Sequence, residues 1–430
     1  MKKLFWGIVS LLALIGVISI GWRLTAGMKI TALSSTVTWG MWVAFYIYFI
    51  GLSAGSFLFS TLIYVFGMHK LEKAGKMALL SALFALFGGL LFVWMDLGHP
   101  MRFWRVFFNW NHTSVLAWES LFYIFYIVAI SLEIWYLMRC DIAALALHAT
   151  GWKRKFYSFL AFGFRCPTTQ EAYDTCHRQS MKVVKVLGII GIPVAIGVHG
   201  GTGALFAVVA ARPYWFGPLF PIIFIVSALV SGAALTTFLY AYFGKKEDSD
   251  YLDIVKSLAN FLVLFIAIDV LLMISEFLTN LYAGLPEHSE VLHEILFGPF
   301  NYTFWVGQLL LAIVLPIVLI AWKKSQPNWL GLAGLSAVVG IVAVRLNLVI
   351  PAYIVPVLKG LDKAYVNPRW TYSYFPSMGE WLTTIGAIAL LVLGFGIAWK
   401  LLPIFGEVER RFVDTLPSSV SQREGVSYGK

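Results

Sequence analysis

The chain has 430 residues, of which 60% are hydrophobic and only 13% are charged. So few charged side chains cannot cover a soluble protein of this size, and the composition therefore excludes an ordinary soluble globular domain. The net charge of +10 does not indicate a nucleic-acid partner, because the Lys and Arg residues are scattered over short segments rather than gathered on one face.

Ten apolar runs are each long enough to cross a hydrocarbon core of about 30 Å as a helix. They cover residues 5–22, 40–66, 77–97, 114–138, 183–210, 218–243, 257–284, 302–322, 329–350 and 382–402. The first run follows Met-Lys-Lys as a secretory signal would, but no small-x-small cleavage site follows it closely, and we interpret it as a span. The sequence thus predicts an all-α polytopic membrane protein, with a membrane domain over 1–403 and a polar tail over 404–430.

The distribution of positive charge predicts the orientation. If the N-terminus is cytoplasmic, the cytoplasmic segments and tails hold 22 of the 32 Lys and Arg residues. The positive-inside rule therefore places both termini, and the segment 139–182, in the cytoplasm.

Two connecting segments are long enough to have a role of their own. The segment 139–182 has room for an amphipathic stretch, with Lys153 to Lys155 near anionic headgroups, and serves either as a membrane-surface linker or as a docking surface. Its cysteines Cys140, Cys166 and Cys176 match no metal signature, and in a reducing compartment we expect them to be incidental thiols. The outer segment 351–381, rich in proline and aromatic residues, suits a lid or a protein-binding surface.

Charged groups gather at the outer ends of the spans. The stretch MDLGHPMRFW ends the third run and carries Asp96, His99 and Arg102, with Arg105 just beyond it. In the predicted orientation the outer halves of five runs carry Asp96, Glu119, His199, Glu276 and Arg345. Ionisable groups inside a membrane usually face the bundle interior, so we expect these groups to line one polar pocket at the outer surface.

Carboxylates also follow one another along two helices. Asp269 and Glu276 are seven residues apart and share a helix face, and Glu119 and Glu133 are fourteen apart on nearly the same face. This arrangement is expected of a proton path. Simpler interpretations stay open: Asp96 and Arg102 as helix-end groups, Arg345 as a counter-charge, Glu133 at the cytoplasmic interface, and His199 with its neighbouring glycines as packing residues.

A b-type haem usually needs two interior histidines on facing helices, and of the eight histidines only His199 lies well inside a run. No Cys-rich cluster motif is present either. We therefore expect no haem, iron–sulfur cluster or metal site in this chain.

Several motifs in order resemble the NrfD/PsrC family of quinone-interacting membrane subunits over nearly the whole chain. They are TWGMWVAFYIYFIGLSAGSF, MDLGHPMRFW followed by NHTSVLAWES, VHGGTGALF, ISEFLTN, VRLN and YSYFPSMGEW. The last four are especially similar to the ten-helix branch that includes HybB, QrcD and DsrP. One departure is His99, where the family commonly has Arg; whether His99 replaces that charge or adds a proton-transfer group is open.

The resemblance implies two side-by-side four-helix bundles, formed by spans two to five and six to nine, with two peripheral helices. It also implies a subunit of a multi-subunit respiratory complex in the cytoplasmic (inner) membrane, in contact with membrane lipid and holding no redox cofactor of its own. Such a subunit binds menaquinone or ubiquinone near the outer leaflet and exchanges electrons with an extracytoplasmic ferredoxin-like iron–sulfur subunit.

Quinol oxidation needs an imidazole or carboxylate within hydrogen-bond reach of the quinone oxygen. We expect His199 and Asp96 to be those partners, with Glu119 and Glu276 handling protons and Arg345 keeping the carboxylates ionised. The remaining predicted site residues are His99 at the pocket mouth, Ser114 from the family signature, and Trp39, Trp42 and Tyr46 as an apolar wall, although the aromatic residues equally suit interface anchoring. Two other functions stay open: a passive membrane anchor, or an ion or solute transporter with a helix broken near Pro193.

Overall fold

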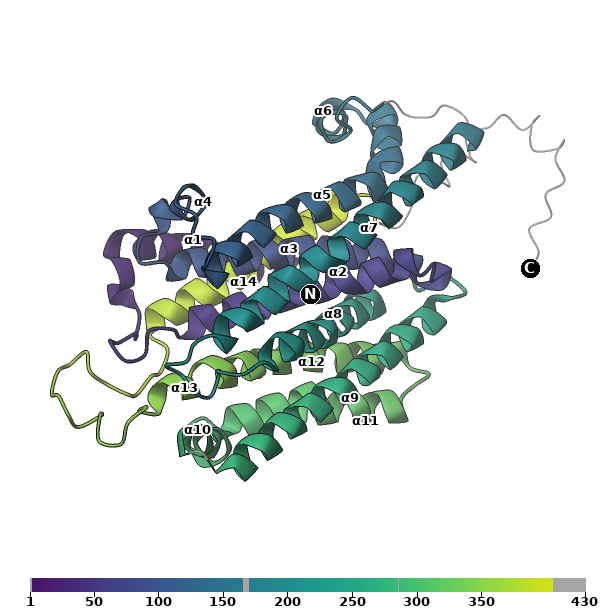
Figure 1. Cartoon of the computed structure of the whole chain (residues 1–430). Helices are drawn as coiled ribbons and strands as arrows, with labels where there is room; N and C mark the ends of the chain where they lie inside the picture. The colour runs from purple at the N-terminus through teal and green to yellow at the C-terminus, as the bar shows by residue number, and fades with distance from the viewer. Residues whose placement is uncertain (1, 165–169, 285, 405–430) are drawn as a thin grey trace, which may run out of the picture.

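The computed structural model describes residues 2–164, 170–284 and 286–404 (Figure 1). Within these ranges all regular secondary structure is helical, and ten segments are long and apolar enough to cross a bilayer. The spanning segments are α1 (Lys2–Ala26), α2 (Met41–Val65), α3 (Glu72–Asp96), α5 (Val115–His148), α7 (Gln170–Ala207), α8 (Phe220–Phe243), α9 (Tyr251–Ala283), the π-helix η4 (Thr303–Val314) continued by α11 (Leu315–Trp322), α12 (Pro327–Val349) and α14 (Met378–Leu401). The predicted all-α fold with about ten spans is confirmed for the described part of the chain.

Short helices shape the connections between the spans. They are η1 (Gly27–Ile30), η2 (His69–Leu71), η3 (Pro100–Arg102), α4 (Arg105–Phe108), α6 (Gly151–Leu160), α10 (Pro286–Phe297) and α13 (Pro351–Ile354). α10 occupies most of a segment expected to be a loop, and its Glu290 pairs with Lys359 of the 351–381 segment at 3.6 Å. The polar tail falls almost entirely on residues 405–430, which lie outside the described residues.

Helix α2 lies at the centre of the molecule. Its membrane-spanning stretch is buried along its length, and it packs against α3, α7, α8 and α12. The closest contact depends on glycine, since a Cβ on Gly55 would lie 1.7 Å from the carbonyl oxygen of Ala228 on α8. Small residues let backbones approach closely in a bilayer, where lipid is as apolar as the helix surface.

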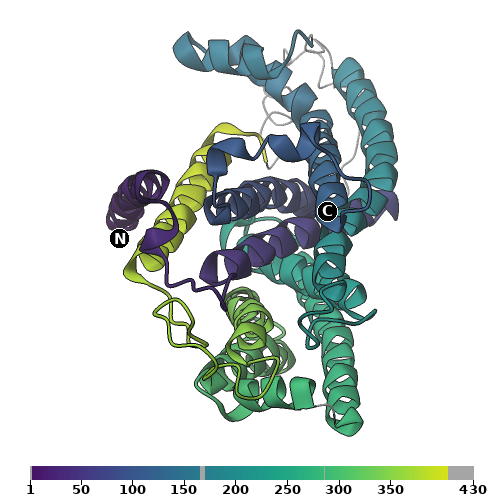
Figure 2. The ribbon, with the colours of Figure 1, turned by 60° about the vertical axis from the view of Figure 1, so that its left-hand side comes forward.

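The remaining spans pack in groups around α2. α2, α3, α5 and α7 contact one another, as do α8, α9, α12 and the η4–α11 span. α1 and α14 form a separate pair at the edge, and Figure 2 shows this pair apart from α9 and α10. Gly16 and Gly386 allow the close α1–α14 approach, because a Cβ on Gly16 would lie 2.6 Å from the Cα atom of Gly386.

The segment 139–182 differs from the expectation. α5 continues to His148 and α7 begins at Gln170, so much of the expected connection is helical. Hydropathy ended the run at Arg139, but a helix needs only its backbone hydrogen bonds to continue. The charge of Asp141 is accommodated by Lys76 at 2.8 Å and by a hydrogen bond of 2.5 Å from the hydroxyl of Tyr173.

The prediction for the cysteines was wrong for two of the three. Cys140 of α5 and Cys176 of α7 form a disulfide. Spacing in the sequence did not indicate it, because the two cysteines are 36 residues apart and meet only when the extended ends of α5 and α7 pack together. Cys166 lies outside the described residues.

Candidate functional site

Glu119 of α5 is the centre of a buried hydrogen-bond cluster. Its Oε1 atom accepts hydrogen bonds from the hydroxyls of Tyr46 at 2.5 Å, Thr202 at 2.6 Å and Tyr123 at 3.1 Å. Tyr46 and Tyr123 also contact each other at 2.7 Å. The Oε2 atom of Glu119 is buried without a hydrogen-bond partner among the described residues. The cluster thus offers one carboxylate oxygen that can still accept a proton.

His199 lies one helical turn before Thr202 on α7. Its side chain is 1% exposed, and within the described structure neither ring nitrogen has a hydrogen-bond partner. The ring packs against Phe224 of α8, with centroids 5.4 Å apart. A buried polar group without a partner costs free energy, so an imidazole held this way is typical of a binding or reaction site.

Arg345 of α12 reaches toward the same region. It is 2% exposed, and its Nη2 atom donates a hydrogen bond of 2.9 Å to the hydroxyl of Ser227. Its Nε atom is buried with no hydrogen-bond partner in the described ranges. A Cβ on Gly51 of α2 would lie 3.3 Å from Nη2 of Arg345 and 3.3 Å from Cε1 of His199. The guanidinium and the imidazole therefore meet beside a helix position that has no side chain.

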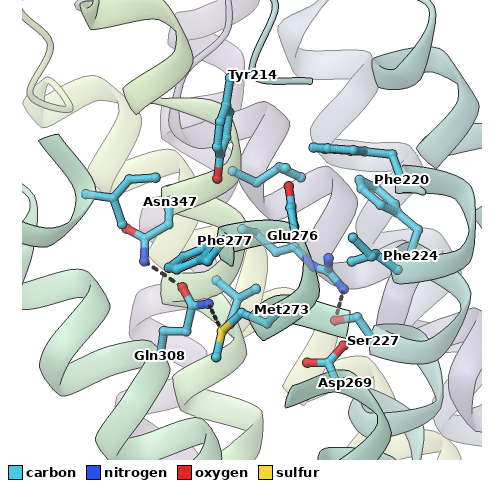
Figure 3. A pocket seen from close by; sticks show the side chains of 15 residues that line it. Tyr214, Phe220, Phe224, Ser227, Asp269, Met273, Glu276, Phe277, Gln308 and Asn347 are labelled. Atoms are coloured by element: carbon cyan, nitrogen blue, oxygen red, sulfur yellow. Dashed lines mark hydrogen bonds between the residues drawn. The ribbon is translucent and has the colours of Figure 1, made fainter. Parts of the chain in front are cut away.

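A pocket lies next to Arg345, among α8, α9, α12 and η4 (Figure 3). It encloses about 650 Å³, counting the space at its open mouth. Asp269 and Glu276 both line it, two turns apart on α9, and Tyr214 directs its hydroxyl toward it. The other lining groups include Ser227, Phe224 and Phe277. An apolar pocket with a few polar groups is the usual form of a small-molecule site.

One side of the pocket is closed by amides that sequence reasoning missed. Gln308 of η4 donates a hydrogen bond to the sulfur of Met273 on α9 at 3.2 Å and accepts one from Asn347 of α12 at 2.9 Å. Asn347 also accepts a hydrogen bond from Thr303. A lone amide in an apolar run was the available signal, and the VRLN motif already contained Asn347. Gln308 lies in the π-helix, a geometry often found at functional sites.

Asp96 lies in different surroundings from His199. Its neighbours are Arg23 of α1 and Glu380 of α14, and its Oδ1 atom is buried with no hydrogen-bond partner in the described structure. Arg23 donates hydrogen bonds to the carbonyl oxygens of Met95 at 2.9 Å and Leu97 at 2.7 Å, which holds the end of α3. The contacts therefore do not gather Asp96 and His199 in one pocket.

The predicted aromatic residues divide between two places. Trp42 donates a hydrogen bond of 3.0 Å to Thr383 of α14, and Arg23 lies over its ring, so it belongs to the surroundings of Asp96. Trp39 instead stacks on Trp215 with centroids 5.8 Å apart and contacts Tyr353, at the outer end of the bundle. Arg212 lies over the Tyr353 ring at 4.5 Å, and burial lowers the pKa of its guanidinium.

The other residues of the early motif lie at the surface. His99 is exposed at the start of η3, and Arg102 and Arg105 are exposed as well. Ser114 is the N-cap of α5, where its hydroxyl accepts a hydrogen bond from the backbone N–H of Ala117 at 3.4 Å. A serine before a helix satisfies such free N–H groups.

Glu133 lies deeper along α5 and is fully buried. Neither carboxylate oxygen has a hydrogen-bond partner among the residues described. Its neighbours are Tyr64 and Tyr126, and the Tyr126 hydroxyl contacts that of Ser53 at 3.1 Å. The first bundle thus contains polar groups from Glu119 down to Glu133.

A ten-span bundle with carboxylates, an imidazole and a guanidinium buried in its interior defines the class of protein: an integral membrane protein with a polar reaction or transfer site, rather than an apolar anchor. Residues 29–357, more than half of the chain, match the family model described as "Polysulphide reductase, NrfD". The chain belongs to this family, as its motifs predicted.

Named relatives span nearly the same length. The chain is 50% identical to a membrane-family relative from Mesobacillus selenatarsenatis that is named as a selenate reductase subunit, over 95% of each chain. It is 27% identical to the Hdr-like menaquinol oxidoreductase integral membrane subunit of Archaeoglobus fulgidus, over 88% of each chain. It is 21% identical to the menaquinone reductase integral membrane subunit of Nitratidesulfovibrio vulgaris, over 90% of this chain and 89% of the relative. The chain is thus similar to membrane subunits of oxidoreductase complexes.

Proposed function

We propose that this chain is the quinol-reactive membrane subunit of a respiratory complex in the cytoplasmic membrane. It exchanges electrons between menaquinone or ubiquinone and an extracytoplasmic iron–sulfur subunit. Two relatives are named for menaquinol or menaquinone. The 50% identity to a selenate reductase subunit favours a complex of that type, in which electrons leave the quinol for a terminal reductase.

The observation that carries the proposal is the state of His199. It lies in the interior of a membrane bundle with both ring nitrogens unpartnered in the described structure, between the Glu119 cluster and Arg345. Keeping an unpartnered imidazole there is costly unless a ligand with hydroxyl or carbonyl oxygens completes its hydrogen bonds. A quinol headgroup has such oxygens, and an aromatic and aliphatic wall suits its ring and isoprenoid tail.

The chemistry assigns a role to each group. Quinol oxidation releases two electrons and two protons, and His199 accepts a hydrogen bond from a quinol hydroxyl and then its proton. Glu119 is the next proton acceptor through its free Oε2 atom, since Thr202 links the two residues along α7. Arg345 favours the ionised form of the neighbouring carboxylates.

Protons have two further sets of carriers under this proposal. Glu133, with Tyr126 between it and Glu119, extends the file toward the cytoplasmic side in the first bundle. Asp269 and Glu276 serve the second bundle through their shared pocket. Asp96 stays a candidate for proton transfer at the outer end, with the exposed His99 beside it in sequence.

The partner docks on the outer face, over the segments 98–113, 285–301 and 351–381. The segment 285–301 has Glu287, Glu290 and Glu294 and no Lys or Arg, and can steer a basic patch on the partner. This placement depends on the orientation with both termini cytoplasmic, which the positive-inside rule supports.

The test uses the complex purified from native membranes, with its co-purifying subunits and quinone identified. Quinol-dependent reduction of the iron–sulfur partner is then measured for the wild type, for His199→Ala, and for the exposed-site control Arg105→Ala. We expect His199→Ala to assemble, to raise KM for quinol and to lower kcat, while Arg105→Ala stays close to wild type. An assembled His199→Ala complex with full quinol-linked activity would remove the site from this position.

A further inference from the structure

Helix α6 is separate from the polar site. Its sequence, GWKRKFYSFL, contains three consecutive basic residues, Lys153, Arg154 and Lys155, and no acidic residue. All three basic side chains are exposed. A local positive charge of this size attracts phosphate-bearing headgroups at a membrane surface.

The direction of α6 is unlike that of the spans. Figure 1 shows α6 nearly end-on, whereas α5 and α7 extend across the same view, and Figure 2 shows α6 from its side. Its axis therefore runs across the direction of the spans. A helix that lies across the spans at their ends is parallel to the membrane plane.

Two hydrogen bonds place α6 at the level of the membrane surface. The hydroxyl of Tyr157 donates a hydrogen bond of 2.9 Å to the carbonyl oxygen of Leu401, the last residue of α14. Trp135 of α5 donates one of 2.9 Å to the carbonyl oxygen of Leu160. α14 has 24 residues. A helix of that length is about 36 Å long and exceeds the hydrocarbon core only slightly, so its end lies at the interface.

The faces of α6 fit such a position. Trp152, Phe156 and Phe159 are four and three residues apart and share one face, and Trp152 and Phe159 are 61% and 71% exposed. Tyr157 is buried against the protein. By helix geometry Arg154 lies opposite the aromatic face, and Lys153 and Lys155 flank it. Long basic side chains in flanking positions extend to headgroups while their stems cover apolar surface.

We propose that α6 is a binding site for anionic phospholipid headgroups, in the leaflet where α1 begins and α14 ends. Trp152 and Phe159 enter the acyl boundary, and Lys153, Arg154 and Lys155 contact the phosphates. A soluble protein partner fits less well, because two large aromatic side chains are exposed at the depth where lipid lies. The site is independent of quinol chemistry and of which face is cytoplasmic.

The first test counts lipids retained by the full-length chain in detergent, by native mass spectrometry, after titration with phosphatidylglycerol or phosphatidylcholine. We expect the wild type to prefer phosphatidylglycerol. Lys153→Gln/Arg154→Gln/Lys155→Gln should lose roughly 10- to 100-fold in that affinity. The control Lys323→Gln/Lys324→Gln removes two exposed lysines from the loop between α11 and α12 and should keep it. No preference in the wild type, or equal loss in both variants, overturns the proposal.

A second measurement does not depend on the charge variant. The wild type and Trp152→Phe are placed in nanodiscs of brominated phosphatidylglycerol, and the difference between their tryptophan emission reports Trp152 alone. We expect this difference to be strongly quenched relative to unbrominated lipid. An unquenched difference would show that Trp152 does not enter lipid, and the proposal would fail.

Discussion

His199 of α7 and Arg345 of α12 approach the same point on α2. That point is Gly51, where an added Cβ would lie 3.3 Å from an atom of each side chain. The missing side chain leaves the space in which the imidazole and the guanidinium meet between the two groups of helices. The proposed quinol site therefore depends on three helices that are far apart in sequence.

Gly51→Ala tests this relationship with a single methyl group. Its contacts would be tighter than ordinary van der Waals contacts, so His199 and Arg345 must shift by a few tenths of an ångström. We expect KM for quinol to rise by roughly 3- to 10-fold, because a small displacement weakens hydrogen bonds that depend on geometry. The control is Gly21→Ala on α1, where an added Cβ meets nothing within 4 Å. Unchanged quinol kinetics in Gly51→Ala would argue against a site at this position.

Glu119→Gln tests proton transfer from the hydroxyl cluster. The amide oxygen can still accept hydrogen bonds from Tyr46, Tyr123 and Thr202, but the side chain can no longer take a proton. We expect quinol-dependent turnover to fall by roughly 10²-fold, the usual range for losing a general base. Tyr123→Phe, which removes only the longest of the three hydrogen bonds, should have a smaller effect. Similar losses in both variants would mean that the cluster is structural.

Asp96→Asn and Arg23→Lys separate chemistry from structure at the outer end of α3. Asp96→Asn keeps the shape of the side chain but cannot accept a proton, and should lower turnover by roughly 10²-fold with little change in thermal stability. Arg23→Lys loses the fork that donates to both Met95 and Leu97, and should lower the free energy of unfolding by about 1–3 kcal/mol. Full turnover in an assembled Asp96→Asn complex would leave Asp96 a structural group.

The disulfide between Cys140 and Cys176 predicts a loss of stability on its removal. It closes a loop of 36 residues between α5 and α7. Removing such a crosslink costs at most about 4 kcal/mol in the chain-entropy model, and less here because the two helices also pack together. Thermal unfolding of Cys140→Ser/Cys176→Ser should therefore start at a lower temperature, with quinol turnover at low temperature unchanged. Identical unfolding of variant and wild type under non-reducing conditions would contradict this.

The sequence by itself determined the membrane class, the ten spans and the family. These features are local, because a run of about 20 apolar residues must form a helix in lipid whatever its neighbours are. It also identified the polar residues that matter, since charges inside a span are costly wherever they point. Glu119, His199, Arg345, Asp269 and Glu276 were all selected on this basis, before any contact was known.

Only the tertiary structure decided which of these residues meet. Hydropathy reports the depth of a residue but not the rotation of its helix, which packing against other helices sets. Asp96 and His199 have similar predicted depths, yet Asp96 faces Arg23 and His199 faces Arg345. For the same reason Gln308 and Asn347 were recognisable as a pair only once η4 lay beside α12. A bilayer determines where a helix begins and ends, and its neighbours determine which side chains share a pocket.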